Sequence, residues 1–154
     1  MTAGQEAAPD AYPADVEPLL ELPDLPHNAA LLDYLRGQAS PPSDPGDYTL
    51  GSWQLHTHPD LIAVLRELAP GWPLTAAYGV PLLAGEGIAA VVALGTDWLA
   101  VRIGHLPPEF ETEDSDHPAW SFVRGDWHVI PIWQNQLGEL VTAALTYTAS
   151  LAAK

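Results

Sequence analysis

Cysteine and basic residues are what this sequence has least of. Its 154 residues include no cysteine and five bases, and Lys154 is the one lysine. Without cysteine there are no disulfides, thiolate nucleophiles or cysteine-based metal sites. HExxH, GxSxG, GxGxxG and Walker-type lysine motifs are missing as well, so the sequence predicts no catalytic residue and no cofactor.

The shortage of bases also sets the charge. Twenty acidic residues oppose the five bases and give a formal net charge of −15, which repels nucleic-acid phosphates and anionic membrane surfaces. No apolar run reaches the length of a membrane span, and residues 1–10 lack the features of a signal peptide. We therefore expect a cytoplasmic protein that binds neither nucleic acid nor membrane, and whose protein partner, if charged, is basic.

The residues that are abundant form short apolar runs, and three of them lie between residues 78 and 103. They are separated by glycine-bearing turns at 85–87 and 95–97. The middle run, 88–94, is apolar on both faces and predicts a central strand. The last run alternates as in a half-buried strand. One face carries Leu99, Val101 and Ile103, and the other carries Trp98, Ala100 and Arg102. An antiparallel meander is the expected scaffold.

Other elements are predicted around this meander. Apolar spacing and turn residues indicate the following: helices at 28–36, 59–69 and 135–152, and a hairpin of 120–123 and 127–132. Asn28 is placed to cap the first helix, and Pro59 suits the first position of the second. Pro81 lies inside the run 74–84, which predicts either an edge strand or an interruption at that point.

Together these elements predict an α+β fold. We expect an antiparallel sheet of four to five strands, made of the meander plus the hairpin, with helices mostly on one face and an amphipathic C-terminal helix. Residues 1–27 are rich in proline, alanine and acids and are expected to form a flexible extension. Residues 28–154 are expected to form a single domain, in which 104–119 is a solvated acidic loop.

From Pro59 onward the chain carries a series of short motifs in a recognisable order. They are Tyr78-Gly79, Gly87-Ile88, Leu99-Ala100-Val101-Arg102 and Trp127-His128-Val129. In this order they resemble the TfoX N-terminal and YjbR-like domains, which are small α+β folds. The resemblance implies no catalytic residues, and the family's link to competence and nucleic-acid regulation is opposed by this chain's charge.

His56 and His58 form the most metal-like pair in the sequence. In an extended segment two residues at this spacing project to the same side, where their ring nitrogens could share a Zn²⁺ ion. The sequence does not fix a third ligand. Because Pro59 follows directly and marks a helix start, packing at that helix start is favoured over a metal site.

Tryptophan and arginine residues make a candidate partner or ligand patch, because these residue types anchor interfaces. The patch consists of Trp98, Arg102, Trp120, Arg124 and Trp127. Core packing is the commoner role of a tryptophan and is the competing interpretation. Arg124-Gly125-Asp126 is expected to be a hairpin turn.

The last predicted helix carries small residues opposite its apolar stripe. They are Thr142, Thr146, Ala149 and Ala153. Small side chains let a second helix or sheet approach closely, so this stripe predicts a homodimer contact, with an ordinary exposed face as the alternative. The expected function is that of a non-enzymatic interaction or regulatory protein, acidic and homodimeric, that binds a protein partner. The alternative is a small-molecule or metal-binding domain, hydrolases included, that uses the Trp/Arg face or the histidines.

Overall fold

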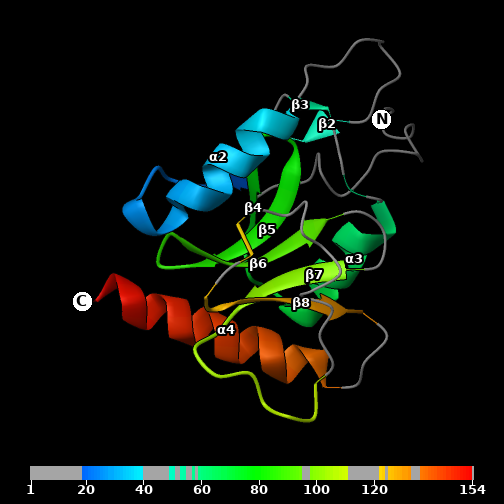
Figure 1. Cartoon of the computed structure of the whole chain (residues 1–154). Helices are drawn as coiled ribbons and strands as arrows, with labels where there is room; N and C mark the ends of the chain where they lie inside the picture. Colours follow the sequence, from blue (N-terminus) through cyan, green and yellow to red (C-terminus); the bar gives the residue numbers. More distant parts are fainter. Residues whose placement is uncertain are drawn as a thin grey trace.

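The computed structural model describes residues 19–39, 49–50, 53–54, 57, 59–94, 98–110, 122–123, 125–132 and 136–153. Its elements in chain order are β1 (Leu19–Glu21), η3 (Pro26–Asn28), α2 (Ala29–Gln38), β2 (Thr49–Leu50), β3 (Trp53–Gln54), α3 (Pro59–Leu68), β4 (Leu74–Ala77), β5 (Val80–Gly85), β6 (Ile88–Leu94), β7 (Trp98–Arg102), β8 (Trp127–Pro131) and α4 (Leu137–Ala152). Figure 1 shows an α+β fold in which the described helices surround one main sheet.

The main sheet has six strands in the order β1-β4-β5-β6-β7-β8. β1 runs parallel to β4, and the other neighbours are antiparallel. β2 and β3 form a separate two-stranded sheet. β6 lies inside the main sheet, and its side chains from Ile88 to Ala93 are buried. The prediction of a central strand that is apolar on both faces is therefore confirmed.

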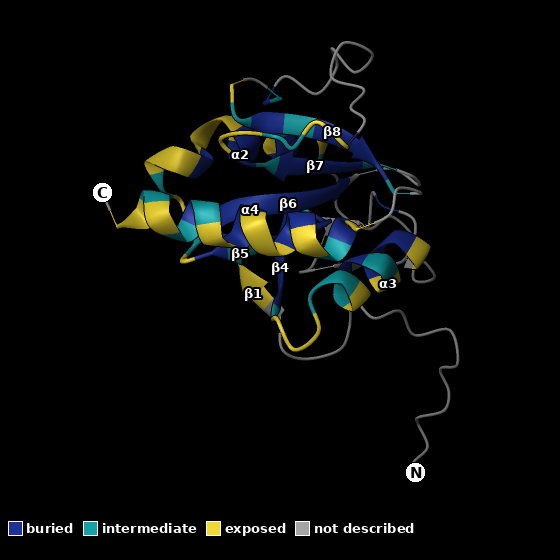
Figure 2. Cartoon of the chain, turned by 90° about the horizontal axis from the view of Figure 1, so that it is seen from below, coloured by how far each residue is buried: buried dark blue, intermediate teal, exposed yellow. Residues whose placement is uncertain are grey.

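The sheet separates two hydrophobic cores. On one face α3 and α4 pack against side chains that include Leu99, Val101 and Ile103. On the other face α2 packs against side chains that include Ala100 and Trp127. The predicted alternation in β7 is thus correct. Figure 2 shows the buried positions concentrated on the strands, while α2 and α4 turn exposed residues outward. The helices do not all share one face: α3 and α4 do, and α2 covers the second face.

The predicted count of four to five strands is too low. Tyr78 and Gly79 have φ angles of 52° and 83° and form a tight turn, so the run 74–84 divides into β4 and β5. β1 adds a further strand from within residues 1–27, where an extension was expected. Three residues, Leu-Leu-Glu, carry too little periodicity to predict a strand, and only pairing with β4 defines them as one. Residues 1–18 lie outside the described residues.

The predicted hairpin of 120–123 and 127–132 is also corrected. β8 pairs with β7, and Phe122 and Val123, the described part of 120–123, are not in a strand. Phe122 is buried in the second core, where its ring meets that of Trp127 edge-on at a centroid distance of 5.2 Å. Burial of this aromatic pair accounts for the irregular path of the chain at Phe122.

Pro81 lies in an interior strand, so the edge-strand prediction is wrong. Ala77 and Val80 close the β4–β5 hairpin, and the alternation of a strand then directs the backbone nitrogen of Pro81 toward β6. Extending the β5–β6 register by one residue places Pro81 opposite Ala93. The Ala93 carbonyl instead accepts a hydrogen bond of 2.7 Å from the Thr57 hydroxyl. Thr57 thereby replaces the donor that proline lacks.

Asn28 stands at the predicted N-cap position of α2, but its side chain makes no cap hydrogen bond. It is fully buried, and its Nδ2 donates to the carbonyls of Pro23 and Gly87 at 2.9 Å each. Its Oδ1 accepts from the Ala89 N–H at 3.0 Å. The side chain therefore joins the 23–25 loop to the β5–β6 hairpin, and the predicted capping role is wrong.

Prediction for α4 docking: Gly85→Ala should lower the free energy of unfolding by about 2 kcal/mol. An added Cβ would overlap the Leu145 carbonyl oxygen and lie 2.5 Å from Thr148 Oγ1. Gly37→Ala is the control, because its Cβ would meet nothing within 4 Å and alanine favours a helix by about 1 kcal/mol over glycine. Urea denaturation measures both. Equal unfolding midpoints for the two variants would show that α4 does not require a glycine at this contact.

Candidate functional site

Three residues of the predicted Trp/Arg patch lie in the described part of the chain, and they share one face of the sheet. Arg102 is paired with Trp127 across β7 and β8, and Trp98 lies on the same face of β7. Trp127 is 6% exposed and belongs to the second core, whereas Trp98 is half-buried. Trp120 and Arg124 lie outside the described residues.

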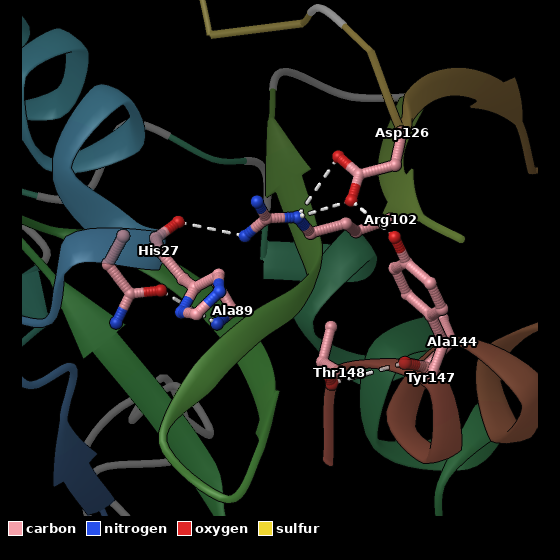
Figure 3. A network of polar contacts seen from close by, with 8 residues as sticks. His27, Ala89, Arg102, Asp126, Ala144, Tyr147 and Thr148 are labelled. Carbon is pink, nitrogen blue, oxygen red and sulfur yellow. Dashed lines mark hydrogen bonds and ion pairs between the residues drawn. The ribbon is translucent and has the colours of Figure 1, made fainter. Parts of the chain in front are cut away.

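Arg102 is held by contacts on several sides (Figure 3). Its Nε donates to both carboxylate oxygens of Asp126 at 3.2 Å, and a terminal nitrogen donates to the His27 carbonyl at 2.8 Å. The guanidinium carbon lies 5.4 Å from the ring centroid of Trp127. The Arg102 side chain is 12% exposed and that of Asp126 is 23% exposed. Such a shielded ion pair is stronger than one on the open surface.

Tyr147 of α4 extends this contact to the other side of the sheet edge. Its hydroxyl donates to Asp126 Oδ2 at 2.7 Å. The ring lies against Gly104, where an added Cβ would be 3.0 Å from Tyr147 Cε1. The hydrogen bond to Asp126 raises the pKa of the Tyr147 hydroxyl, with burial and the charge of Asp126 acting in the same direction and Arg102 opposing them.

Local backbone structure brings Asp126 to this position. Gly125 has a φ of 64°, a value that glycine adopts without strain, and the Asp126 carbonyl accepts from the Ile103 N–H at 2.8 Å. Gly125 and Asp126 do lie in a turn, but not in the predicted hairpin turn, because the described residues before it, Phe122 and Val123, form no strand. The role of Asp126 was missed because it is one of twenty acidic residues, and Tyr147 was missed because no spacing connects it to β8.

This cluster connects several segments of the domain through hydrogen bonds and an ion pair. Asp126 accepts from two partners and Arg102 donates to two acceptors, so each charge is compensated within the chain. The cluster joins η3, β7, the turn before β8, and α4. Arg102 and Trp127, two members of the predicted patch, are therefore engaged in contacts within the domain, and the role of the patch as a partner or ligand surface stays a prediction.

The other described arginines are also engaged within the chain. Arg36 donates to Asp33 at 2.9 Å and to the Tyr78 hydroxyl at 3.3 Å, and Arg66 has an interaction of its own. Among the described residues, six exposed acids make no ion pair. They are Glu21, Asp24, Glu67, Glu86, Glu109 and Glu139. The unpaired charge of the described surface is therefore negative.

The remaining candidates were the histidine pair and the small residues of α4. His56 and His58 lie outside the described residues, and no group of three potential metal ligands occurs in the part of the chain that is described. Thr142, Thr146 and Ala153 are exposed on α4, whereas Ala149 is half-buried, near the backbone of Gly85. No described helix has the length and apolar character needed to span a membrane.

Prediction for the Tyr147 contact: the stability advantage of the wild type over Tyr147→Phe should disappear at high pH. The pKa of Tyr147 is raised in the folded state, so its contribution is complete below the unfolded pKa of about 10. It is then lost as the pH rises through the folded pKa. Unfolding free energies of both proteins from pH 8 upward measure this. Curves that stay parallel above pH 10 would contradict the assignment.

Comparison with known proteins adds no information about the function of this chain. No protein-family model, curated protein or solved structure shows significant similarity to this chain. The resemblance to TfoX N-terminal and YjbR-like domains thus stays a hypothesis that depends on the sequence motifs. A function for the chain must be argued from its own fold, charge and surface.

Proposed function

We propose that this chain is a non-enzymatic interaction or regulatory protein that binds a basic protein partner through an acidic surface. The observation that carries the proposal is the distribution of charge. The described arginines are engaged in contacts within the chain, while six exposed acids have no ion pair among the described residues. A surface of this kind attracts a cationic partner and speeds its association.

The best-supported contact region is the surface around β1, which we call the β1 surface. It consists of Leu20, Glu21, Asp24, Trp72 and Glu86. Leu20 and Trp72 are the exposed large hydrophobic residues of the described chain, at 49% and 44% exposure. Exposed apolar side chains among charged ones are typical of protein interfaces, and tryptophan is enriched among the residues that contribute most to binding.

Several contacts hold the parts of the β1 surface near one another. Trp72 Nε1 donates to the Ala84 carbonyl at 3.1 Å, which places the indole beside the β5–β6 turn that carries Glu86. The 23–25 loop packs on the same turn, because a Cβ added at Gly87 would lie 3.3 Å from side chains of that loop. Leu20 is paired with Thr75, three residues beyond Trp72. Asp24, Trp72 and Glu86 therefore come from neighbouring segments, and Leu20 and Glu21 lie on the adjacent edge strand, where they project to opposite sides.

A non-enzymatic role is favoured by the saturation of the cluster of Arg102, Asp126 and Tyr147. Arg102, Asp126 and Tyr147 bond to one another and to the His27 carbonyl. A catalytic acid, base or nucleophile would need at least one of these groups directed at a substrate position. No contact among the described residues favours the alternative of a small-molecule, metal-binding or hydrolytic domain.

Prediction for the β1 surface: Glu21→Gln, Asp24→Asn and Glu86→Gln together should weaken partner binding by about tenfold or more at physiological salt. Glu67→Gln, Glu109→Gln and Glu139→Gln form the control triple, because they change the net charge equally at other exposed sites. Tagged full chains of each kind are used to capture partners from native lysate, and mass spectrometry quantifies each captured protein. Equal capture by the two triples would contradict a partner site at β1.

A homodimer through the exposed side of α4 is a further part of the proposal. Thr142, Thr146 and Ala153 are exposed there, and the charged residue in the first turn of the helix is Glu139. A surface helix normally carries more charge on its solvent side. Small uncharged side chains would let a symmetry-related helix approach closely.

Prediction for the dimer: Thr146→Glu should convert a dimeric wild type to monomer, because a carboxylate buried in the contact would cost several kcal/mol, on the order of 3. Ala30→Glu adds the same charge at an exposed position of α2 and should leave the dimer intact. Light scattering over a concentration series gives the molar mass of each protein. A monomeric wild type, or a Thr146→Glu dimer of unchanged affinity, would refute the α4 contact.

A further inference from the structure

β1 is attached to the sheet by few contacts. Its three residues pair with Leu74–Ala76 of β4, and the next residue, Leu22, donates its N–H to the Ala76 carbonyl at 3.1 Å. Leu22 is 8% exposed, whereas Leu20 is 49% exposed and Glu21 is exposed. Of the side chains described from residue 20 to residue 22, that of Leu22 is buried, and a short row of backbone hydrogen bonds joins the strand to β4.

The chain that follows β1 is fixed independently of it. Asn28, which is fully buried, donates to the Pro23 and Gly87 carbonyls at 2.9 Å each. Arg102 donates to the His27 carbonyl at 2.8 Å. These bonds hold the backbone from Pro23 to Asn28 on the sheet whether or not β1 is in place. A change of backbone direction between Leu22 and Pro23 would release β1 together with Leu22.

β4 keeps its other contacts without β1. It pairs with β5 on its opposite side, and its four side chains are buried. β4 has no charged residue and directly follows Pro73, whereas β1 carries Glu21 and is followed by Leu22 and Pro23. Charge, shortness and proline are the features that prevent further strands from adding to a sheet edge. β1 thus covers an edge of β4 that carries no charged side chain of its own.

We propose that β1 is a displaceable cap on the edge of β4. Residues 19–22 detach and return as a unit, while the sheet from β4 to β8 and helix α2 stay folded. Detachment uncovers the outward backbone groups of β4 and removes Leu20 and Glu21 from its edge. The opening is a property of the free chain, so its test does not depend on the proposed partner.

Hydrogen–deuterium exchange of the full-length wild type tests the proposal. The amides of residues 19–22 and the outward amides of β4 should exchange about 100-fold faster than those of β6, because a local opening has a lower free energy than global unfolding. Exchange of residues 19–22 as slow as that of β6 would overturn the proposal, since β1 would then open only when the whole domain unfolds.

Two variants separate the cap from the rest of the domain. Leu22→Asp should accelerate exchange in residues 19–22 and β4 by about tenfold or more and leave β6 and β7 unchanged, because a buried aspartate favours the open state. Leu20→Asp places the same charge on an exposed position and should change little. If Leu22→Asp accelerates β6 to the same degree, or abolishes folding, β1 is an integral part of the domain and the proposal fails.

Discussion

The buried amide of Asn28 is the interaction on which the arrangement of the N-terminal half depends. Its three hydrogen bonds reach a loop, a hairpin turn and the first residues of β6. A donor or acceptor left unpaired at such a buried site costs about 1–3 kcal/mol, so these three segments are held in one relative position. That position sets where α2 begins and hence how it covers the second core.

Sequence patterns predicted the parts of the fold that repeat with a regular period. The β6 run is apolar on both faces, β7 alternates, and α3 and α4 show helical spacing, and these elements occur within two residues of their predicted bounds. β1 and the division at Tyr78-Gly79 could not be predicted from periodicity, because one depends on pairing with a distant strand and the other on a backbone turn. For the site, the sequence placed Arg102 and Trp127 in one candidate patch, but Asp126 and Tyr147 become recognisable only when the turn before β8 and helix α4 meet in three dimensions.

Contacts between residues far apart in the sequence also determine which charges are left unpaired at the surface. The described arginines are engaged in contacts within the chain. Arg102 connects its strand to η3, and Arg36 contacts Asp33 and Tyr78. With five bases in the chain, few remain to neutralise the acids outside. Each Arg–Asp pair compensates one charge of either sign, so the excess of negative charge that the composition sets remains with the unpaired acids.

The amino acids that can replace Pro81 depend on Thr57, and those that can replace Thr57 depend on Pro81, although the two residues belong to different segments of the chain. The Thr57 hydroxyl bonds the Ala93 carbonyl, at the position where the residue opposite would ordinarily donate. An amino acid with a backbone N–H at position 81 would compete with Thr57 for that carbonyl, and loss of the hydroxyl beside Pro81 would leave the carbonyl unpaired. Substitutions at the two positions should therefore be non-additive, and a lineage that loses one of these residues gains from losing the other.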